Sequence, residues 1–147
     1  MPREMNNRQA WYNYHIDDKY VAGIVLLGTE VKSVREGKVS FADAYCLFDK
    51  GELWLRGLHI AEYKFGTANN HIAVHDRKLL LTQKELKRLQ AKINEKGFTL
   101  IPLRVFFNEK NLVKVEIGLA RGKKTHDKRE SIKAKDAERE LNRSFKY

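Results

Sequence analysis

The sequence predicts a mainly β fold with one or two flanking helices and a basic C-terminal tail. Two observations lead to this prediction. Short segments rich in alternating apolar residues recur between turn residues up to position 120, and the last 27 residues never return to a core pattern. Five or six antiparallel strands with a helix filling a gap fit a small closed OB-like β-barrel, although a sandwich has the same number of strands. We therefore expect residues 1–122 to form the body and residues 123–147 a separate tail.

The first elements of the body are predicted to be a long extended segment and a short helix. Residues 14–27 are rich in aromatic and β-branched residues, with the run 17–19 (Asp-Asp-Lys) as a turn. Residues 29–35 place Val31 and Val34 three positions apart, on one face of a helix. Gly37 is expected to end this helix.

Two hairpins are predicted. Residues 41–48 and 53–58 are joined at 49–52, where Gly51 tolerates a positive φ. Residues 98–107 and 113–120 are joined around 108–111. In the last strand, Lys114 and Glu116 are expected to face outward and the alternating apolar residues inward: Val113, Val115, Ile117 and Leu119.

A helix follows the apolar triplet at residues 79–81, which predicts a short buried strand. Thr82 and Glu85 have the spacing of a capping box. The helix is expected to run to Lys96, with Gly97 as its end. Its buried face is predicted to carry Leu86, Leu89 and Ile93.

Composition favours one soluble, cytoplasmic domain. The chain has 147 residues, of which 42% are hydrophobic and 33% charged, and it contains no apolar run long enough to span a membrane and no N-terminal signal pattern. We expect no membrane partner. Cys46 is the single cysteine, so an internal disulfide is excluded, and its apolar neighbours indicate a buried, unreactive thiol.

The sequence does not predict an enzyme, a metal site or a cofactor. His71 and His75 are four residues apart, a spacing that binds metal on a helix, but no helix and no third ligand are indicated there. Adjacent Asp17 and Asp18 are better explained as turn residues than as a carboxylate dyad. The chain has no glycine-rich phosphate loop and no nucleophile with a base at a suitable spacing.

Charge points instead to a polyanionic partner. The chain has a formal net charge of +10, and residues 121–147 contain ten Lys or Arg and five Asp or Glu, a net charge of +5. A compact body with a cationic arm suits RNA, which offers phosphates to basic side chains and unpaired bases to aromatic ones. The candidates are the basic groups Arg8, Lys32, Arg35, Lys38, Arg77, Lys78, Arg121, Lys123 and Lys124, with Asn7 and the rings of Trp11, Tyr12, Tyr14, Tyr63 and His71. Each of these residues also has an ordinary explanation, as a solvated charge or as a ring packed in or around the core.

Four blocks of the sequence resemble the small protein B family (SmpB, the SsrA-binding proteins that bind tmRNA in bacteria). They lie at residues 22–38, 77–81, 113–116 and 118–129, and the match spans roughly residues 7–142. The chain departs from the family's usual pattern at four positions. Val21 stands where Glu is common, Ala73 and His75 replace a Pro and an Arg, and Thr82 replaces Asn or His.

The resemblance implies the OB-like barrel and a non-enzymatic role in rescuing stalled ribosomes. The barrel is expected to bind the tRNA-like domain of tmRNA, whose aminoacylated form would bring elongation factor Tu indirectly. By position, the RNA-face motifs are Asn7, Arg8, Arg77, Lys78, Leu80, Arg121, Lys123 and Lys124. The tail, disordered when free and helical on the ribosome, is expected to reach 16S rRNA in the A site and decoding centre through Asp127, Lys128, Arg129, Lys133, Lys135, Arg139 and Arg143.

Two further points stay open in the sequence. Leu80 lies in the apolar triplet, so we expect it to point into the core rather than to pack on RNA. The alternatives to tmRNA binding are a generic ribosome-associated RNA-binding barrel or RNA chaperone and a small RNA-modifying enzyme, the latter disfavoured by the lack of a catalytic set.

Overall fold

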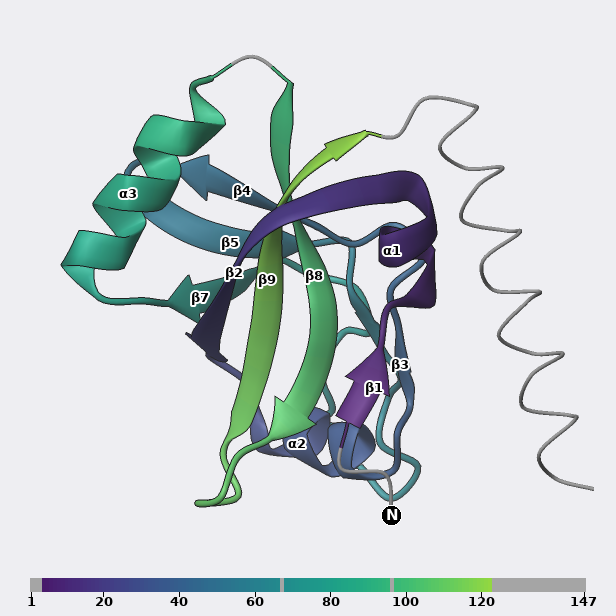
Figure 1. Cartoon of the computed structure of the whole chain (residues 1–147). Coiled ribbons are helices and arrows are strands. Elements are labelled where there is room, and N and C mark those ends of the chain that lie inside the picture. The colour runs from purple at the N-terminus through teal and green to yellow at the C-terminus, as the bar shows by residue number, and fades with distance from the viewer. Residues whose placement is uncertain (1–3, 67, 96, 123–147) are drawn as a thin grey trace, which may run out of the picture.

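A computed structural model describes residues 4–66, 68–95 and 97–122 as a body in which a strongly curved sheet is flanked by helices (Figure 1). The helices are α1 (Arg8–Asn13), α2 (Gly28–Arg35) and α3 (Gln83–Ile93). The strands are β1 (Glu4–Asn6), β2 (Tyr14–Ile24), β3 (Val39–Ser40), β4 (Tyr45–Asp49), β5 (Glu52–Arg56), β6 (His59–Ile60), β7 (Arg77–Leu80), β8 (Phe98–Phe107) and β9 (Val113–Gly122). The predicted mainly β body with flanking helices is confirmed.

Six strands close into a ring of antiparallel pairs. Going round the ring, β8 pairs with β4, β4 with β5, β5 with β7, β7 with β2, β2 with β9, and β9 again with β8. Strand β1 pairs with one end of β8, at residues 104–106, while β4 meets β8 at the single pair Cys46 and Leu100. Strands β3 and β6 form a separate small sheet. Because every long strand has two neighbours, the ring encloses the core.

Strand β2 corrects the predicted turn at residues 17–19. Strand β2 continues through this region without a turn. It pairs with β9 on both sides of it, with a β-bulge between Ile16 and Asp18. A bulge inserts one residue and bends a strand without ending it. Polar turn-forming residues therefore mark an irregularity within the strand. Helix α1 and strand β1, which precede it, were not predicted.

The two predicted hairpins are present. In the β4–β5 turn, Lys50 and Gly51 both have a positive φ, of 52° and 78°, as in the turns that match the twist of a hairpin. Strand β4 begins at Tyr45 rather than at Phe41. A Cβ at Gly57 would lie 2.2 Å from the carbonyl oxygen of Asp43, so the absence of a side chain allows these two segments to touch.

Helix α3 has the predicted start and a slightly earlier end. The hydroxyl of Thr82 accepts the N–H of Glu85 at 3.2 Å, and the Glu85 carboxylate accepts the N–H of Thr82 at 3.3 Å. The helix ends at Ile93, three residues before the predicted end. Leu89 is buried, and Leu86 and Ile93 pack against the same core, so α3 covers one end of the ring.

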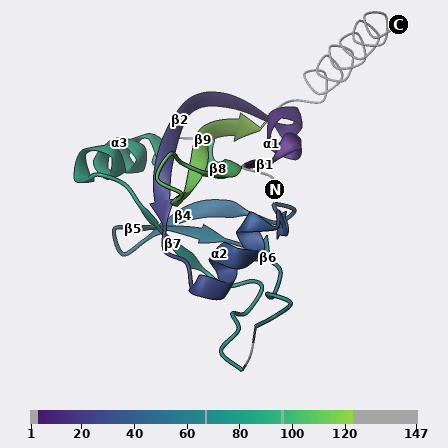
Figure 2. The same cartoon turned by 90° about the horizontal axis from the view of Figure 1, so that it is seen from below.

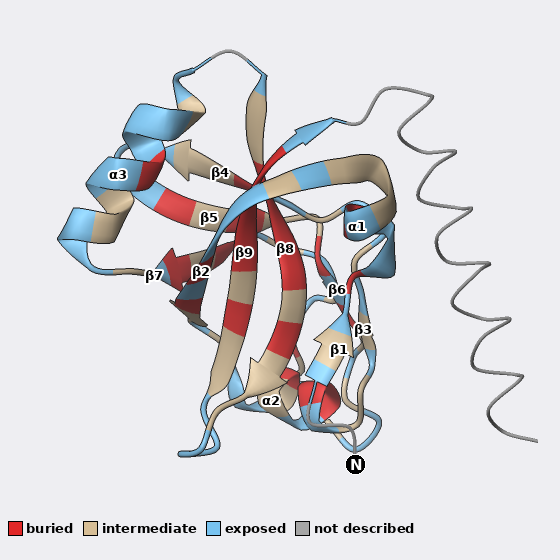
Figure 3. Cartoon of the chain, viewed as in Figure 1, coloured by how far each residue is buried: buried red, intermediate tan, exposed pale blue. Residues whose placement is uncertain are grey.

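The core lies inside the ring and shows the expected alternation (Figure 3). Val115, Ile117 and Leu119 are buried, whereas Lys114 and Glu116 are partly exposed. Cys46 is buried, as predicted, and burial raises the pKa of its thiol. No helix among the described residues is long and apolar enough to cross a membrane.

Candidate nucleic-acid interface

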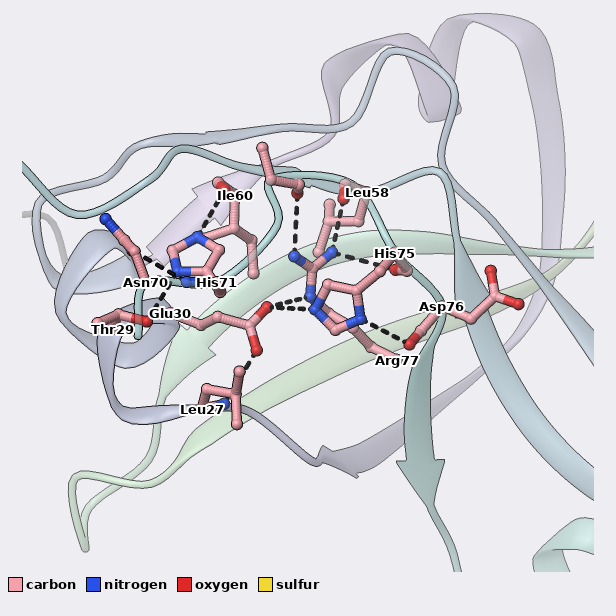
Figure 4. A network of polar contacts seen from close by, with 11 residues as sticks. Leu27, Thr29, Glu30, Leu58, Ile60, Asn70, His71, His75, Asp76 and Arg77 are labelled. Atoms are coloured by element: carbon pink, nitrogen blue, oxygen red, sulfur yellow. Dashed lines mark hydrogen bonds and ion pairs between the residues drawn. The ribbon is translucent and has the colours of Figure 1, made fainter. Parts of the chain in front are cut away.

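A network of polar side chains lies beneath the connection between β6 and β7 (Figure 4). Its centre is Glu30, in the first turn of α2, which is fully buried. One carboxylate oxygen accepts the backbone N–H of Leu27 at 2.9 Å, and the other accepts from Arg77 Nε and lies 3.0 Å from His75 Nε2. The network joins the start of α2 to the start of β7.

Arg77 belongs to this interior network. Its side chain is 1% exposed, and its remaining donors reach the carbonyl oxygens of Leu58 at 2.6 Å and Ala73 at 3.0 Å. Arg77 is therefore buried in the free protein, and its predicted RNA contact stays a prediction. A guanidinium has five N–H donors in a fixed planar geometry. Here these donors link the connection between β6 and β7 to helix α2.

His71 is also an interior residue, 3% exposed. Its Nε2 donates to the carbonyl oxygen of Ile60 at 2.9 Å, which leaves Nδ1 to accept the hydroxyl of Thr29 at 2.9 Å. Both ring nitrogens have partners within the body, and the predicted RNA contact of His71 stays a prediction. Among the described residues, no three His, Cys, Asp or Glu side chains lie together in a way that could hold a metal ion.

The pKa of Glu30 reflects competing effects. Burial raises it, but the N–H of Leu27, the guanidinium of Arg77 and the imidazole of His75 stabilise the carboxylate and outweigh burial. The pKa of Glu30 therefore lies below its usual value. The buried carboxylate is charged at neutral pH, and its charge is compensated within the network.

The two predicted residues at the N-terminal end have different surroundings. Asn7 is buried, its backbone N–H donates to the carbonyl oxygen of Leu103 and its side chain donates to that of Pro102, both at 2.8 Å. This Asn fixes the junction of β1 and α1 to β8 and lines the same cleft as Arg8, and its predicted RNA contact stays a prediction. Arg8 is exposed and lines a cleft of about 710 Å³ between α1, residues 39–45 and β8, together with Gln9 and Asn13.

An exposed apolar surface lies where β2 and β7 pair. Leu80 is 50% exposed and stands opposite Gly23 in the pairing. The expectation that Leu80 points into the core is wrong, because successive strand residues face opposite sides and Leu79 occupies the core position. A Cβ at Gly23 would lie 3.4 Å from Leu80 Cβ and 3.6 Å from Lys114 Nζ. We call the surface formed by Val21, Gly23, Leu80 and Lys114 the β2–β7 surface.

The other described basic candidates lie at the surface, and each contacts a nearby aromatic ring or carboxylate. Lys32 Nζ is 5.2 Å from the centre of the Tyr63 ring, the Arg35 guanidinium 5.9 Å from that of Phe107, and Lys38 contacts Glu36 at 3.0 Å. Lys78 lies 3.5 Å from Glu52 and Arg121 3.1 Å from Asp17. All of these pairs are partly open to solvent. Lys123 and Lys124 lie outside the described part of the chain. So do the predicted tail residues Asp127, Lys128, Arg129, Lys133, Lys135, Arg139 and Arg143.

Comparison with known families gives a match over nearly the whole chain. The model of the family described as "SmpB protein" matches residues 4–147. The chain is 54% identical over 142 residues to the SsrA-binding protein of Bacteroides thetaiotaomicron, covering 97% of this chain and 95% of that protein. It is 53% identical over 139 residues to the SsrA-binding protein of Mycolicibacterium smegmatis, covering 95% and 86%.

A solved structure is similar as well. Its description reads "tmRNA-SmpB: a journey to the center of the bacterial ribosome". The match has a TM-score of 0.73 and 46% sequence identity, and it covers 89% of this chain and 95% of that one. Fold and sequence therefore agree on the same family.

Proposed function

The chain belongs to the SmpB protein family, and from this membership we propose that it is a tmRNA-binding adaptor of trans-translation. In this role it binds the tRNA-like domain of tmRNA and delivers it to the A site of stalled ribosomes, for rescue and peptide tagging. It acts by binding, without catalysis. The relatives are named for SsrA binding, and the similar structure is described by tmRNA, SmpB and the ribosome.

The β2–β7 surface is the observation that best supports an RNA-binding face on the body. Leu80 is half exposed beside Gly23, so its apolar side chain is accessible. The ammonium of Lys114 lies next to Gly23. Apolar contact with a base or ribose and a cation for a neighbouring phosphate are the two components that RNA recognition combines. Val21, where the family often has Glu, removes a negative charge from this surface.

Several finer parts of the proposal rest on the family. The six-stranded ring is proposed to serve as an OB-type barrel, an architecture that binds oligonucleotides. Residues 123–147 are proposed as a tail that is disordered when free and becomes helical in the decoding centre. Elongation factor Tu would be engaged indirectly through aminoacylated tmRNA, and the protein would work in the cytoplasm.

The proposed division between body and tail has a direct test. Deleting residues 130–147 removes five Lys or Arg but leaves every described element intact. We expect the truncated protein to bind the tRNA-like domain with nearly the affinity of the full chain and to fail in tagging peptides on stalled ribosomes. Binding is measured by titration with the transcript and tagging in a reconstituted translation reaction.

Two results would contradict this division. Tagging by the truncated protein would remove the tail's role, and loss of RNA binding would place the RNA site on the tail. Capturing the full chain from a bacterial lysate distinguishes the generic alternative: recovery of tmRNA supports the proposed function, whereas recovery of bulk rRNA supports a generic ribosome-associated protein.

A further inference from the structure

The connection between β6 and β7 projects from the body on the side away from α3 (Figure 2). It carries Phe65, whose side chain is 71% exposed, the largest exposed fraction of an aromatic ring among the described residues. A ring held in solvent in this way adds nothing to the core and is accessible to a partner.

The projecting segment is internally braced close to Phe65. The Asn70 side chain accepts the backbone N–H of Tyr63 at 3.2 Å and of His71 at 3.0 Å, and donates to the carbonyl oxygen of Tyr63 at 2.9 Å. The N–H of Gly66 also donates to that carbonyl oxygen, at 2.9 Å. The bond between Gly66 and Tyr63 closes a turn in which Phe65 is the residue before Gly66.

The same turn is anchored to the body through His71. Its bonds to Thr29 of α2 and to Ile60 of β6 tie the C-terminal end of this segment to the body, and Figure 4 shows His71 and Asn70 near Glu30. Phe65 is thus presented by a supported turn. Preorganisation of this kind lowers the entropy that a partner must overcome on binding.

The charges around the ring indicate what kind of partner fits. Lys64 Nζ lies 5.6 Å from the centre of the Phe65 ring, and Phe65 meets Tyr63 edge to face at 5.7 Å. Lys32 Nζ lies 5.2 Å from the Tyr63 ring. Two rings and two ammonium groups therefore form one patch, and Glu62, the residue before Tyr63, is exposed as well. An unpaired base with its flanking phosphates offers both a flat ring and negative charge to such a patch.

We propose that Phe65 is a stacking platform for one unpaired RNA base, with Lys64 and Lys32 binding the phosphates on either side. The ammonium of Lys64 now covers the face of the ring, and an incoming base takes its place while Lys64 moves to a phosphate. This inference rests on the proposed function and adds a second RNA contact, separate from the β2–β7 surface. The base comes either from tmRNA or from ribosomal RNA.

Three substitutions of Phe65 separate stacking from simple apolar contact. Phe65→Trp keeps the flat ring, Phe65→Leu keeps only apolar area, and Phe65→Ala removes both. Ile72→Ala is the matched control, because Ile72 belongs to the same connection and is 72% exposed but has no ring. Thermal unfolding of each variant checks folding, and the high exposure of both side chains predicts unchanged melting temperatures.

Each full-length variant is titrated with the tRNA-like domain of tmRNA in one arm and with small ribosomal subunits in the other. We expect Phe65→Ala to weaken binding about fivefold to 150-fold in one arm, which identifies the source of the base. Phe65→Leu is expected to fall between Phe65→Ala and the native chain. Phe65→Trp and Ile72→Ala are expected to bind like the native chain.

The inference is overturned if Phe65→Ala leaves both arms unchanged, or if Phe65→Leu binds as well as the native chain, since a leucine can fill an apolar protein contact but cannot stack. Failure of the native chain to bind either RNA would overturn the proposed function, and this inference with it. If the native chain binds RNA and the substitutions of Phe65 do not change its affinity, only the stacking site is overturned and the proposed function stands.

Discussion

Arg77 and Leu80, at the two ends of strand β7, contrast a charged interior with an apolar surface. Arg77 is fully enclosed and paired with Glu30, whereas Leu80, three residues further on, is half exposed beside Gly23. The charged residue is buried and the apolar residue is exposed, which is the reverse of what their side-chain polarity alone would predict. The contrast shows that strand register and available partners, rather than residue type, decided which side chains of β7 are exposed.

The buried pair has a different energetic character from the exposed surface. Enclosing a carboxylate and a guanidinium costs several kcal/mol per ion, and the network of Leu27, Leu58, Ala73 and His75 offsets that cost with hydrogen bonds. The exposed surface requires no such compensation and can change its contacts. The first region should therefore govern stability and the second RNA affinity.

Removing the Arg77 side chain is expected to have the largest effect. Arg77→Ala leaves the Glu30 carboxylate buried with its main partner gone, at a cost of about 3–5 kcal/mol in the free energy of unfolding. Urea unfolding measures this loss. Arg56→Ala is the matched control: Arg56 pairs with Asp76 at 3.0 Å but is open to solvent, and it should change stability little. Equal effects of the two substitutions would mean that the interior pair has no special role.

Adjacent leucines test the two sides of β7 directly. Leu79→Ala should cost about 2–5 kcal/mol of stability, because Leu79 is 2% exposed in the core. Leu80→Ala should cost about 1 kcal/mol or less, because half of its side chain is already in water, and should weaken binding of the tRNA-like domain. Urea unfolding and RNA titration of both variants give the answer. An RNA affinity that is unaffected by Leu80→Ala would remove the β2–β7 surface from the interface.

Acid should weaken the interior network through Glu30. Because the folded pKa of Glu30 is lowered, its stabilising contribution is complete above the unfolded pKa of about 4.3 and is lost as the pH falls through the lower folded value. Urea unfolding of the native chain should therefore become easier as the pH falls below about 4. Glu30→Gln is expected to be less stable at pH 7 and to show a shallower acid dependence. Identical pH profiles for the two proteins would contradict the assignment.

Charge at the surface should produce the smallest single-site effect. We expect Arg121→Glu to weaken RNA binding severalfold with little change in melting temperature, since Arg121 is exposed and its partner Asp17 is too. Across the native chain, about four to seven phosphate contacts would give a slope of about −3 to −6 in a plot of log affinity against log salt. A slope near zero would leave apolar contacts such as Leu80 as the whole basis of binding.

The sequence by itself determined much of the local structure. Alternating residues predicted β8 and β9, Thr82 and Glu85 predicted the start of α3, and Gly51 predicted a hairpin turn. These are signals that act over a few residues, so a linear pattern contains them. The family blocks likewise predicted the family, because they extend along almost the whole chain. The clustering of positive charge predicted an RNA partner without saying which side chains meet it.

Only the tertiary structure decided the places of Arg77, His71 and Asn7. Their partners are distant in the sequence: Arg77 meets Glu30 across 47 residues, His71 meets Thr29 across 42, and Asn7 meets Pro102 across 95. From the sequence alone, a basic or amide side chain is predicted to lie on the surface, because the buried acceptor that it meets in the fold is not known. Leu80 was misplaced for the converse reason, since three consecutive leucines do not reveal which of them a closed ring turns outward. Burial depends on closure of the ring, and closure joins segments that no local pattern connects.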